Sequence, residues 1–250
     1  MFEKNMSHGI LAHMNTTHTE DMSEDILQRL AQAGAHFAQT KSRRHPSMRQ
    51  YIVGSKERVD IVDLTKTREQ LNKAISAMET FAREGKTLLF VGGKREVADI
   101  VRTVAARVQA PYVSTRWLGG TLTNFTEIKK RIDLLAKLIA DSASDEFEKK
   151  HTKLERIFIG REIERLTRRL DGLVGLSKLP DVLVVVDTRH EELAVREARS
   201  LGIPVVGIQN SDCDIADATH PIVANDASRA TVKIILTELV SAYEKESSRS

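Results

Sequence analysis

Arg116–Phe125, RWLGGTLTNF, is the stretch that decides how the chain is organised. It holds the chain's single tryptophan and two adjacent glycines, and it separates a short apolar run from a long helical pattern. Gly119 and Gly120 can adopt backbone angles that are closed to other residues, and they let another segment approach closely. Thr121 or Thr123 can cap the helix that follows. We interpret the stretch as a tight turn that joins a strand to a helix around a buried tryptophan.

Two helical patterns follow this turn, and a polar segment at residues 141–151 separates them. Apolar residues recur there at intervals of three and four: Phe125, Ile128, Ile132, Leu135 and Ile139, then Ile159, Ile163, Leu166, Leu170 and Leu173. This spacing predicts an antiparallel coiled-coil hairpin of two helices, inserted at residues 121–173. Because charged residues crowd the narrow apolar seam, we expect the hairpin to protrude from the rest of the protein.

On both sides of the hairpin, apolar strands alternate with amphipathic helices. The predicted strands are residues 59–64, 87–91, 112–113, 182–186, 203–208 and 221–223, and the predicted helices are 66–83, 96–108, 191–200 and 228–245. Most of the strands are apolar throughout rather than at every second residue, which predicts a parallel sheet covered on both faces. Right-handed crossovers then give a three-layer α/β domain of the Rossmann or flavodoxin type, built from residues 23–120 and 174–246.

The two ends of the chain are expected to be tails, residues 1–22 and 247–250, of which the first is mobile. Ser23 can cap a short helix over residues 23–37. The N-terminal segment contains three histidines, His8, His13 and His18. Their five-residue intervals do not stack on one helix face, so a mobile tail is favoured over a metal site.

The composition limits the classes of protein to consider. The chain has 250 residues, 41% of them hydrophobic, which is enough for a sizeable core. Lys and Arg number 38 against 35 Asp and Glu, so the net charge of +3 does not by itself indicate an anionic partner. A single cysteine excludes an intramolecular disulfide framework. The start of the chain does not resemble a secretory signal, and no apolar run is long enough for a membrane span, so we expect a soluble, cytoplasmic protein.

Residues 41–58 are strongly basic. Six cations stand there against Glu57 alone: Lys41, Arg43, Arg44, Arg49, Lys56 and Arg58. His45, Pro46, Tyr51 and Gly54 interrupt any regular pattern, so we predict an irregular loop. A basic loop with a histidine and a tyrosine is typical of contact with an RNA backbone, and a solvated surface loop is the alternative.

A possible anion site follows the strand at residues 87–91, where Gly92 and Gly93 precede Lys94 and Arg95. Backbone N–H groups between a strand and a helix attract anions. A P-loop needs Ser or Thr after its lysine, and a dinucleotide fingerprint needs three spaced glycines, and neither pattern is present. An RNA phosphate satisfies the same groups as a free nucleotide does.

Two weaker candidates lie near the ends of later strands. His190 beside Glu191 could form an acid–base pair, although Asp187 or Thr188 capping the next helix is the simpler interpretation. A loose group of metal-binding residue types follows the strand at 203–208, namely Asp212, Cys213, Asp214 and His220. One Cys and one His make half a tetrahedral site, so a turn rich in Asn and Asp is favoured there.

Several stretches together closely resemble the bacterial form of the small-subunit ribosomal protein S2 family. These are RWLGGTLTNF with the hairpin after it, LPDVLVVVDTRHEELAVREARSLGIPVVGI at 179–208, AGAHFAQTKSRRHPSMRQYIVGSKERVDIVDLTKT at 33–67, and VGGKREVADIV at 91–101. The resemblance spans about residues 24 to 240 in the order of the family. The chain departs from the family pattern at Ala38-Gln39, where Gly-His is usual, and at Arg44-His45, where Trp-Asn is usual.

The resemblance implies a structural, non-catalytic protein of the small ribosomal subunit. Family members lie between the head and body of the subunit, bind its ribosomal RNA, join late in assembly, and help to dock the large neighbouring protein that recruits messenger RNA. No cofactor, metal, membrane or small-molecule substrate is expected. The alternative from a different class is a nucleotide- or phosphosugar-dependent enzyme on a Rossmann-like sheet, with Lys94 at its anion site.

Together, the basic residues and the resemblance predict a set of RNA-binding residues and a set that forms the turn. The RNA-binding set is Arg43, Arg44, Arg49, Lys56, Arg58, Lys94, Arg95, Arg116, Trp117, Lys129, Lys130 and Arg131. On the second helix of the hairpin, Arg165, Arg168 and Arg169 are expected to reach RNA or a neighbouring protein. The turn set is Gly119, Gly120 and Asn124.

Overall fold

A five-stranded parallel sheet forms the centre of the protein, as seen in a computed structural model that describes residues 25–143, 147 and 151–249. Its strands are β4 (Leu88–Val91), β5 (Tyr112–Val113), β6 (Val182–Val186), β7 (Val205–Gln209) and β8 (His220–Val223). They lie in the order β5-β4-β6-β7-β8. Counted along the parallel strands this is 2-1-3-4-5, the doubly wound order of flavodoxin-like folds. The parallel α/β prediction is confirmed.

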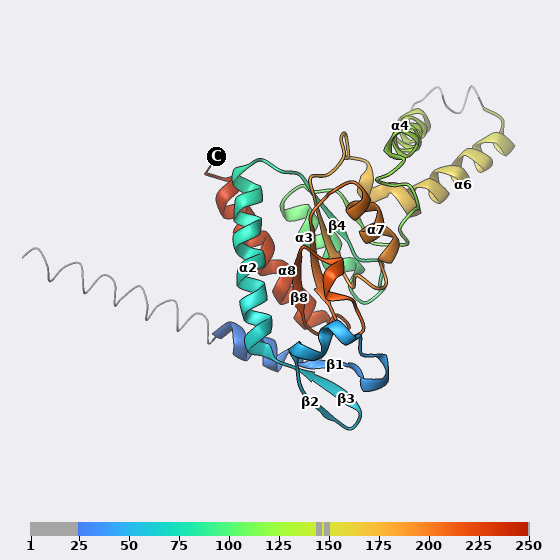
Figure 1. Ribbon diagram of the computed structural model, residues 1–250. Coiled ribbons are helices and arrows are strands. Elements are labelled where there is room, and N and C mark those ends of the chain that lie inside the picture. Colours follow the sequence, from blue (N-terminus) through green and yellow to red (C-terminus); the bar gives the residue numbers. More distant parts are fainter. Residues whose placement is uncertain (1–24, 144–146, 148–150, 250) are drawn as a thin grey trace, which may run out of the picture.

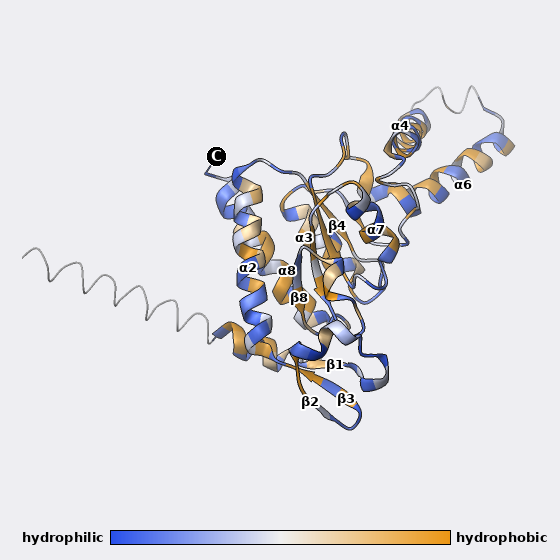
Figure 2. Ribbon diagram, in the orientation of Figure 1, coloured by the Kyte–Doolittle hydropathy of each residue, from blue (hydrophilic) through white to orange (hydrophobic). Residues whose placement is uncertain are grey.

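The continuous apolar strands are explained by burial on both faces of the sheet. Leu88 and Phe90 of β4 face one hydrophobic core, and Leu89 and Val91, the residues between them, face a second core on the opposite side. Strand side chains alternate in direction, so a strand that contacts two cores needs an apolar residue at every position. Figure 2 shows the strands in the hydrophobic colour, whereas α2 (Leu64–Arg83) mixes hydrophilic and hydrophobic residues.

Helices cover both faces of the sheet (Figure 1). The first core is covered by α2, α3 (Ala98–Arg107) and α8 (Arg229–Ser247). The second core is covered by α7 (Glu192–Ser200) together with the adjoining parts of α4 (Phe125–Ser142), α6 (Lys153–Leu170) and the turn η3 (Asp171–Leu173). None of the described helices is long and apolar enough to cross a membrane.

The helical hairpin has the predicted seam. Ile128, Ile132 and Leu135 of α4 are buried in the same core as Leu166 and Leu170 of α6, so the residues spaced by three and four do meet. The start of α6 is fixed by a capping box in which the Thr152 and Glu155 side chains satisfy each other's backbone N–H groups. The predicted helical hairpin is therefore present, and its protrusion as a coiled coil is taken up below.

A second, antiparallel sheet corrects two predictions. It contains β1 (Phe37–Thr40), β2 (Ile52–Lys56) and β3 (Val59–Val62) in the order β1-β3-β2. The strand predicted at residues 59–64 does not join the parallel sheet, and residues 41–58 are not an irregular loop, since they contain β2 and two short 3-10 turns, η1 (Lys41–Arg43) and η2 (Pro46–Tyr51).

The sequence did not predict the hairpin between β2 and β3, because its turn residues are unusual for such a turn. Glu57 and Arg58 form the two-residue turn, with φ angles of +51° and +69°. Turns of this kind usually carry Asn-Gly or Asp-Gly, since these residues tolerate positive φ. Glu-Arg gives no such signal.

The predicted helix over residues 23–37 is also too long, because residues 25–32 are helical and Gly34, at φ +74°, turns the chain toward β1. Ser23, the tail at 1–22 and its three histidines lie outside the described residues.

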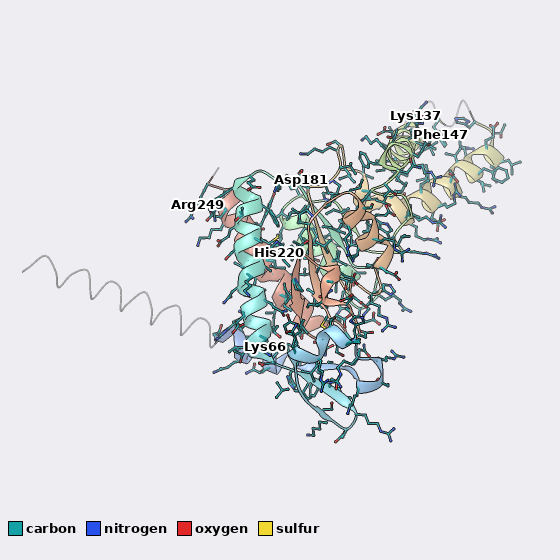
Figure 3. All side chains as sticks on the ribbon, viewed as in Figure 1. Lys66, Lys137, Phe147, Asp181, His220 and Arg249 are labelled. Atoms are coloured by element: carbon teal, nitrogen blue, oxygen red, sulfur yellow. The ribbon has the colours of Figure 1, made fainter. Side chains whose placement is uncertain are left out.

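The small sheet is attached to the carboxyl edge of the parallel sheet through the loop after β7. Ser211 accepts two backbone hydrogen bonds, from the His45 N–H to its carbonyl oxygen (2.8 Å) and from the Gln39 N–H to its hydroxyl (3.1 Å). Lys66, at the start of α2 and labelled in Figure 3, makes a second connection by donating to the Gln50 carbonyl oxygen at 2.5 Å. These bonds give the basic segment a fixed support.

A substitution at Gly172 tests the packing where η3 meets the sheet. A Cβ atom there would lie 2.2 Å from the Tyr112 carbonyl oxygen, whereas a Cβ at Gly175 would meet nothing within 4 Å. We expect Gly172→Ala to lower the free energy of unfolding by about 1–3 kcal/mol, because backbone atoms must move. Gly175→Ala should leave it nearly unchanged. Urea denaturation measures both, and equal stabilities would contradict the observed packing.

Candidate RNA-binding surface and the crevice at the strand ends

The turn RWLGGTLTNF is held by one carboxylate. Glu197 of α7 is buried and accepts five hydrogen bonds from the turn. Oε1 accepts from Trp117 Nε1 at 3.1 Å and from the Gly120 N–H at 2.8 Å. Oε2 accepts from the Leu122 N–H at 2.9 Å, and from the N–H and hydroxyl of Thr123 at 3.1 and 3.2 Å. One carboxylate thus accepts hydrogen bonds from Trp117, Gly120, Leu122 and Thr123.

The predicted caps of the following helix are wrong. The Thr121 hydroxyl donates to a backbone carbonyl inside the turn, and the Thr123 hydroxyl donates to Glu197. Asn124 occupies the N-cap position of α4 but makes no side-chain capping bond. Gly120 has φ +88°, so the predicted need for a glycine is confirmed at this position. The threonine hydroxyls therefore stabilise the turn itself, and neither of them caps α4.

Buried Glu197 remains a good acceptor because its donors outweigh desolvation. Burial by itself raises the pKa of a carboxyl group. Here, the hydrogen bonds from Trp117 and from the backbone N–H groups of Leu122, Gly120 and Thr123 hold the pKa of Glu197 below its ordinary value. The ionised form is therefore the one that the fold stabilises.

A second polar cluster lies at the switch point of the sheet, after β4 and β6, where doubly wound proteins bind ligands. We call it the switch-point centre, and it consists of Gly93, Lys94, Asp187, Glu191 and Asp226. The Gly93 N–H donates to Glu191 Oε1 at 2.9 Å. Lys94 Nζ lies 2.5 Å from Asp187 Oδ2 and 2.7 Å from Asp226 Oδ2. The groups that could hold a phosphate therefore contact carboxylates of the protein itself.

The charges of this centre stabilise one another. Burial alone lowers the pKa of Lys94, but the carboxylates of Asp226 and Asp187 raise it above its ordinary value. Burial alone raises the pKa of Asp187, yet the hydrogen bond and charge of Lys94 hold it below the ordinary value. Burial and repulsion from Asp187 raise the pKa of Asp226. Asp187 also has a φ of +65°, a conformation uncommon outside glycine, which this network helps to maintain.

A hollow of about 400 Å³ adjoins this centre and is lined in part by Arg116, Trp117 and His190. His190 Nε2 lies 3.7 Å from Glu191 Oε1, so the two residues of the suggested acid–base pair are close. Burial raises the pKa of Glu191, and the Gly93 N–H opposes this shift. The helix after this loop starts later than the suggested caps, with Glu191 at its N-cap. Asp187 Oδ1 instead accepts from the N–H groups of the preceding turn.

The four metal-binding residue types that follow β7 face different neighbours. Asp212 pairs with Arg189 at 3.1 Å. Cys213 is buried with its Sγ 3.6 Å from Asp187 Oδ1, and burial raises the pKa of its thiol to about 12. Asp214 accepts from the Ser47 hydroxyl and from a nearby backbone N–H. The His220 ring packs edge-on against Phe81. Within the described part of the chain, no three His, Cys, Asp or Glu residues are placed to hold a metal ion.

A Ser–His–Asp group that the sequence did not predict lies where the small sheet meets this loop. Ser47 Oγ is 2.8 Å from His45 Nδ1 and 3.1 Å from Asp214 Oδ1, and it also accepts from the Ile215 N–H. In a hydrolase the histidine stands between the serine and the aspartate. Here, the serine stands between the other two, so the group joins two segments and does not activate a nucleophile.

The six basic residues of segment 41–58, of which all but Lys41 belong to the predicted RNA-binding set, lie on β2, at the β2–β3 turn and in the turns between β1 and β2. Five are exposed and have no ion pair among the described residues: Lys41, Arg43, Arg49, Lys56 and Arg58. We call these five residues the sheet cations. Arg44 differs, because its Nε lies 3.5 Å from the fully buried carboxylate of Asp60, to which Ser55 also donates at 2.6 Å. Asp60 Oδ2 has no hydrogen bond in this arrangement, so Arg44 supplies its nearest charge.

Other predicted cations gather around the base of the helical hairpin. Two neighbouring hollows there, of about 250 and 510 Å³, both include Leu118 and Arg169 in their linings. Five arginines surround the hollows: Arg116, Arg131, Arg165, Arg168 and Arg169. We call them the arginine cluster. Two of its members also pair within α6, Arg165 with Glu162 and Arg168 with Glu164.

The remaining predicted residues are distributed differently. Lys129 and Lys130 pair along α4 with Asp133 and Glu127, at 3.2 and 2.6 Å. Arg95 is exposed beside the switch-point centre, whereas Trp117 is only 5% exposed and forms part of the core. Lys94 has two internal carboxylate partners, so its role as an RNA contact stays an untested prediction.

The fold and the switch-point centre define a flavodoxin-like α/β protein whose anion-binding groups contact its own carboxylates. Residues 30–246 match the family model described as Ribosomal protein S2. The small ribosomal subunit protein uS2 of Dictyoglomus thermophilum is 41% identical over 221 residues, which covers 88% of this chain and 89% of that protein. The uS2 of Thermus thermophilus is 40% identical over 217 residues, covering 87% and 84%. The chain belongs to the ribosomal protein S2 family, which confirms the resemblance.

Glu197→Gln tests the carboxylate that holds the turn. The amide keeps one acceptor oxygen and turns an NH₂ group toward donors, so we expect the free energy of unfolding to fall by about 2–4 kcal/mol at pH 7. Because the folded state lowers the pKa from 4.5, this stabilisation is present above pH 4.5 and is lost as the pH falls through the lower folded-state value.

Denaturation curves of the two proteins should therefore converge below pH 4.5. Glu192→Gln, an exposed position on the same helix, is the control and should change stability by less than about 0.5 kcal/mol. A constant difference between Glu197→Gln and the parent at all pH values would contradict the carboxylate's role.

Nucleotide binding tests the internal pairing of the switch-point centre. Because Glu191, Asp187 and Asp226 already contact the Gly93 N–H and Lys94, millimolar AMP, ATP or inorganic phosphate should leave the midpoint of thermal unfolding unchanged. Differential scanning fluorimetry measures the midpoint. A rise with a mononucleotide that disappears in Lys94→Ala would instead favour the enzyme alternative.

Proposed function

We propose that the chain is a structural constituent of the small ribosomal subunit that binds ribosomal RNA through the sheet cations. Its relatives are named small ribosomal subunit proteins. The observation that carries the proposal is that five cations cluster on one small sheet and the turns between its strands β1 and β2, without carboxylate partners in the described part of the chain. Phosphate contacts by unpaired Lys and Arg supply most of the affinity for a nucleic-acid backbone.

The support beneath the sheet cations favours this role. Met48 and Val62 of the small sheet region pack in a common core with Cys213 and Val223 of the parallel-sheet domain. Asp60 of β3 is buried and pairs with Arg44, which ties the β2–β3 hairpin to the turn η1. A rigid support lowers the ordering cost of binding, because the backbone that carries the cations is already fixed.

The arginine cluster provides a second proposed RNA contact. Its five members come from the turn and from both helices of the hairpin, so one phosphate chain could follow the base of the hairpin past several guanidinium groups. We also propose that the hairpin protrudes as a coiled coil, and that the two contact areas join the head and body of the subunit. In this arrangement the protein would join late in assembly and help to dock the large neighbouring protein that recruits messenger RNA.

A structural role also agrees with the chemistry of the polar groups. Glu191, Asp187, Lys94 and Glu197 all contact partners within the protein, and each of these contacts positions a turn or a strand end. Cys213 has a raised thiol pKa, which disfavours the reactive thiolate. The residue types that could take part in catalysis thus stabilise the fold, and the exposed cations are the groups available to bind RNA.

The salt dependence of RNA binding tests the sheet cations. Each lost phosphate contact should lower the slope of log K against log salt by about one, so Arg43→Gln with Arg58→Gln should lower it by about two. Filter binding to small-subunit ribosomal RNA over a range of salt concentrations gives the slope. Lys73→Gln, an exposed position on α2, is the control.

Arg44→Gln should behave in the opposite way to the double variant. It leaves the buried Asp60 carboxylate without its charged partner, so the free energy of unfolding should fall by about 2–4 kcal/mol while the salt slope of the folded protein stays the same. An unchanged slope in the double variant Arg43→Gln with Arg58→Gln would remove these two residues from the RNA-binding surface.

A further inference from the structure

A groove between α3 and α8 lies on the face of the sheet opposite the arginine cluster. α3 and α8 pack side by side there (Figure 1), and the hollow between them measures about 660 Å³. Its floor includes Ile100 and Val104 of α3, which are nearly buried, and Ala230 of α8, which is exposed. The proposed RNA contacts do not use this groove.

The rim of the groove is positively charged. Arg229 and Lys233 are exposed, one helical turn apart on α8, and no ion pair involves either of them in the described ranges. The N-terminus of α8 adds a partial positive charge beside them. Arg107, also at the rim, is held by Glu244 at 2.5 Å. The single acid of the lining, Asp99, lies 3.9 Å from Arg102, which offsets its charge.

We propose that this groove docks an acidic amphipathic segment of a neighbouring protein. Carboxylates of that segment would pair with Arg229 and Lys233, while its apolar side chains would lie on Ile100, Val104 and Ala230. The charge of the rim selects an anionic partner, and the apolar floor selects one that brings aliphatic side chains.

The floor favours protein over RNA as the occupant. A phosphate or a base edge pressed onto Ile100 and Val104 would lose water, because neither of these side chains has a hydrogen-bond donor. An acidic helix or strand avoids this loss, since only its apolar side chains reach the floor. A protein contact at this groove therefore adds to the proposed RNA binding and rests on it, on a separate surface of the protein.

Site-specific photo-crosslinking within assembled small subunits tests the proposal. Benzoylphenylalanine replaces Ala230 in one protein and Thr103 in another, both exposed positions of the groove. Each protein is incorporated into subunits reconstituted from purified ribosomal RNA and purified ribosomal proteins, and the particles are irradiated. Mass spectrometry identifies the crosslinked segment. We expect both positions to crosslink to one protein segment that contains several Asp or Glu residues interleaved with aliphatic ones.

Charge variants decide whether the rim selects the partner. Arg229→Gln with Lys233→Gln should lower the crosslink yield about tenfold, since two ion pairs are lost. Arg68→Gln with Lys73→Gln, in the early turns of α2 on the same face, is the matched control and should leave the yield unchanged. Crosslinks to RNA, crosslinks to a segment without acidic residues, no crosslink from either position, or a yield insensitive to the rim charges would each overturn the proposal.

Discussion

The carboxylate of Glu197 determines how the helical hairpin joins the part of the protein built around the parallel sheet. It belongs to α7, on the sheet, and accepts every one of its hydrogen bonds from the turn that leads into the hairpin. A turn with paired glycines has many accessible conformations, and five bonds to one fixed carboxylate select a single conformation. The direction in which α4 leaves the sheet, and so the position of the arginine cluster, follows from this contact.

At the switch point, the protein's own carboxylates contact the groups that bind anions in nucleotide-binding folds. The strand ends of a doubly wound sheet present unpaired N–H groups and a favourable field for anions. Here, Glu191 and Asp187 supply the negative charge, and Lys94 links β4, β6 and the loop before α8 through Asp187 and Asp226. The same groups that would grip a phosphate therefore hold the carboxyl edge of the sheet together, which gives a rigid base for the small sheet.

Much of the architecture could be predicted from sequence because its signals are periodic. The strand at Val182–Val186 is predicted with its observed bounds, and α2, α3, α7 and α8 to within two residues, since apolar runs and caps repeat along the chain. The helix predicted over residues 23–37 instead ends at residue 32. The β2–β3 hairpin could not be predicted, because Glu57 and Arg58 carry no turn signal and their positive φ depends on the strands around them.

Only the basic residue types of the candidate site could be predicted, because the contacts that distinguish them join segments that are distant in the sequence. Basic residue types identified the sheet cations, but charge alone could not separate exposed Arg43 from Arg44, whose partner Asp60 lies in β3, 16 residues later in the sequence. Glu197 was missed because its donors are mainly backbone N–H groups, which have no residue identity. The arginine cluster forms only when the hairpin closes and brings Arg131 beside Arg165. Contacts between distant segments leave no local pattern.

The attachment of the small sheet has a consequence for the order in which the newly made protein matures. Gln39 bonds to Ser211, 172 residues later, and Thr67 donates to the Val223 carbonyl oxygen, 156 residues later. The basic segment is thus synthesised well before its anchors, which follow it by more than 150 residues. A nascent polypeptide that lacks residues 211–223 also lacks the fixed platform for its cations, so the protein becomes competent to bind only after this later segment has been translated.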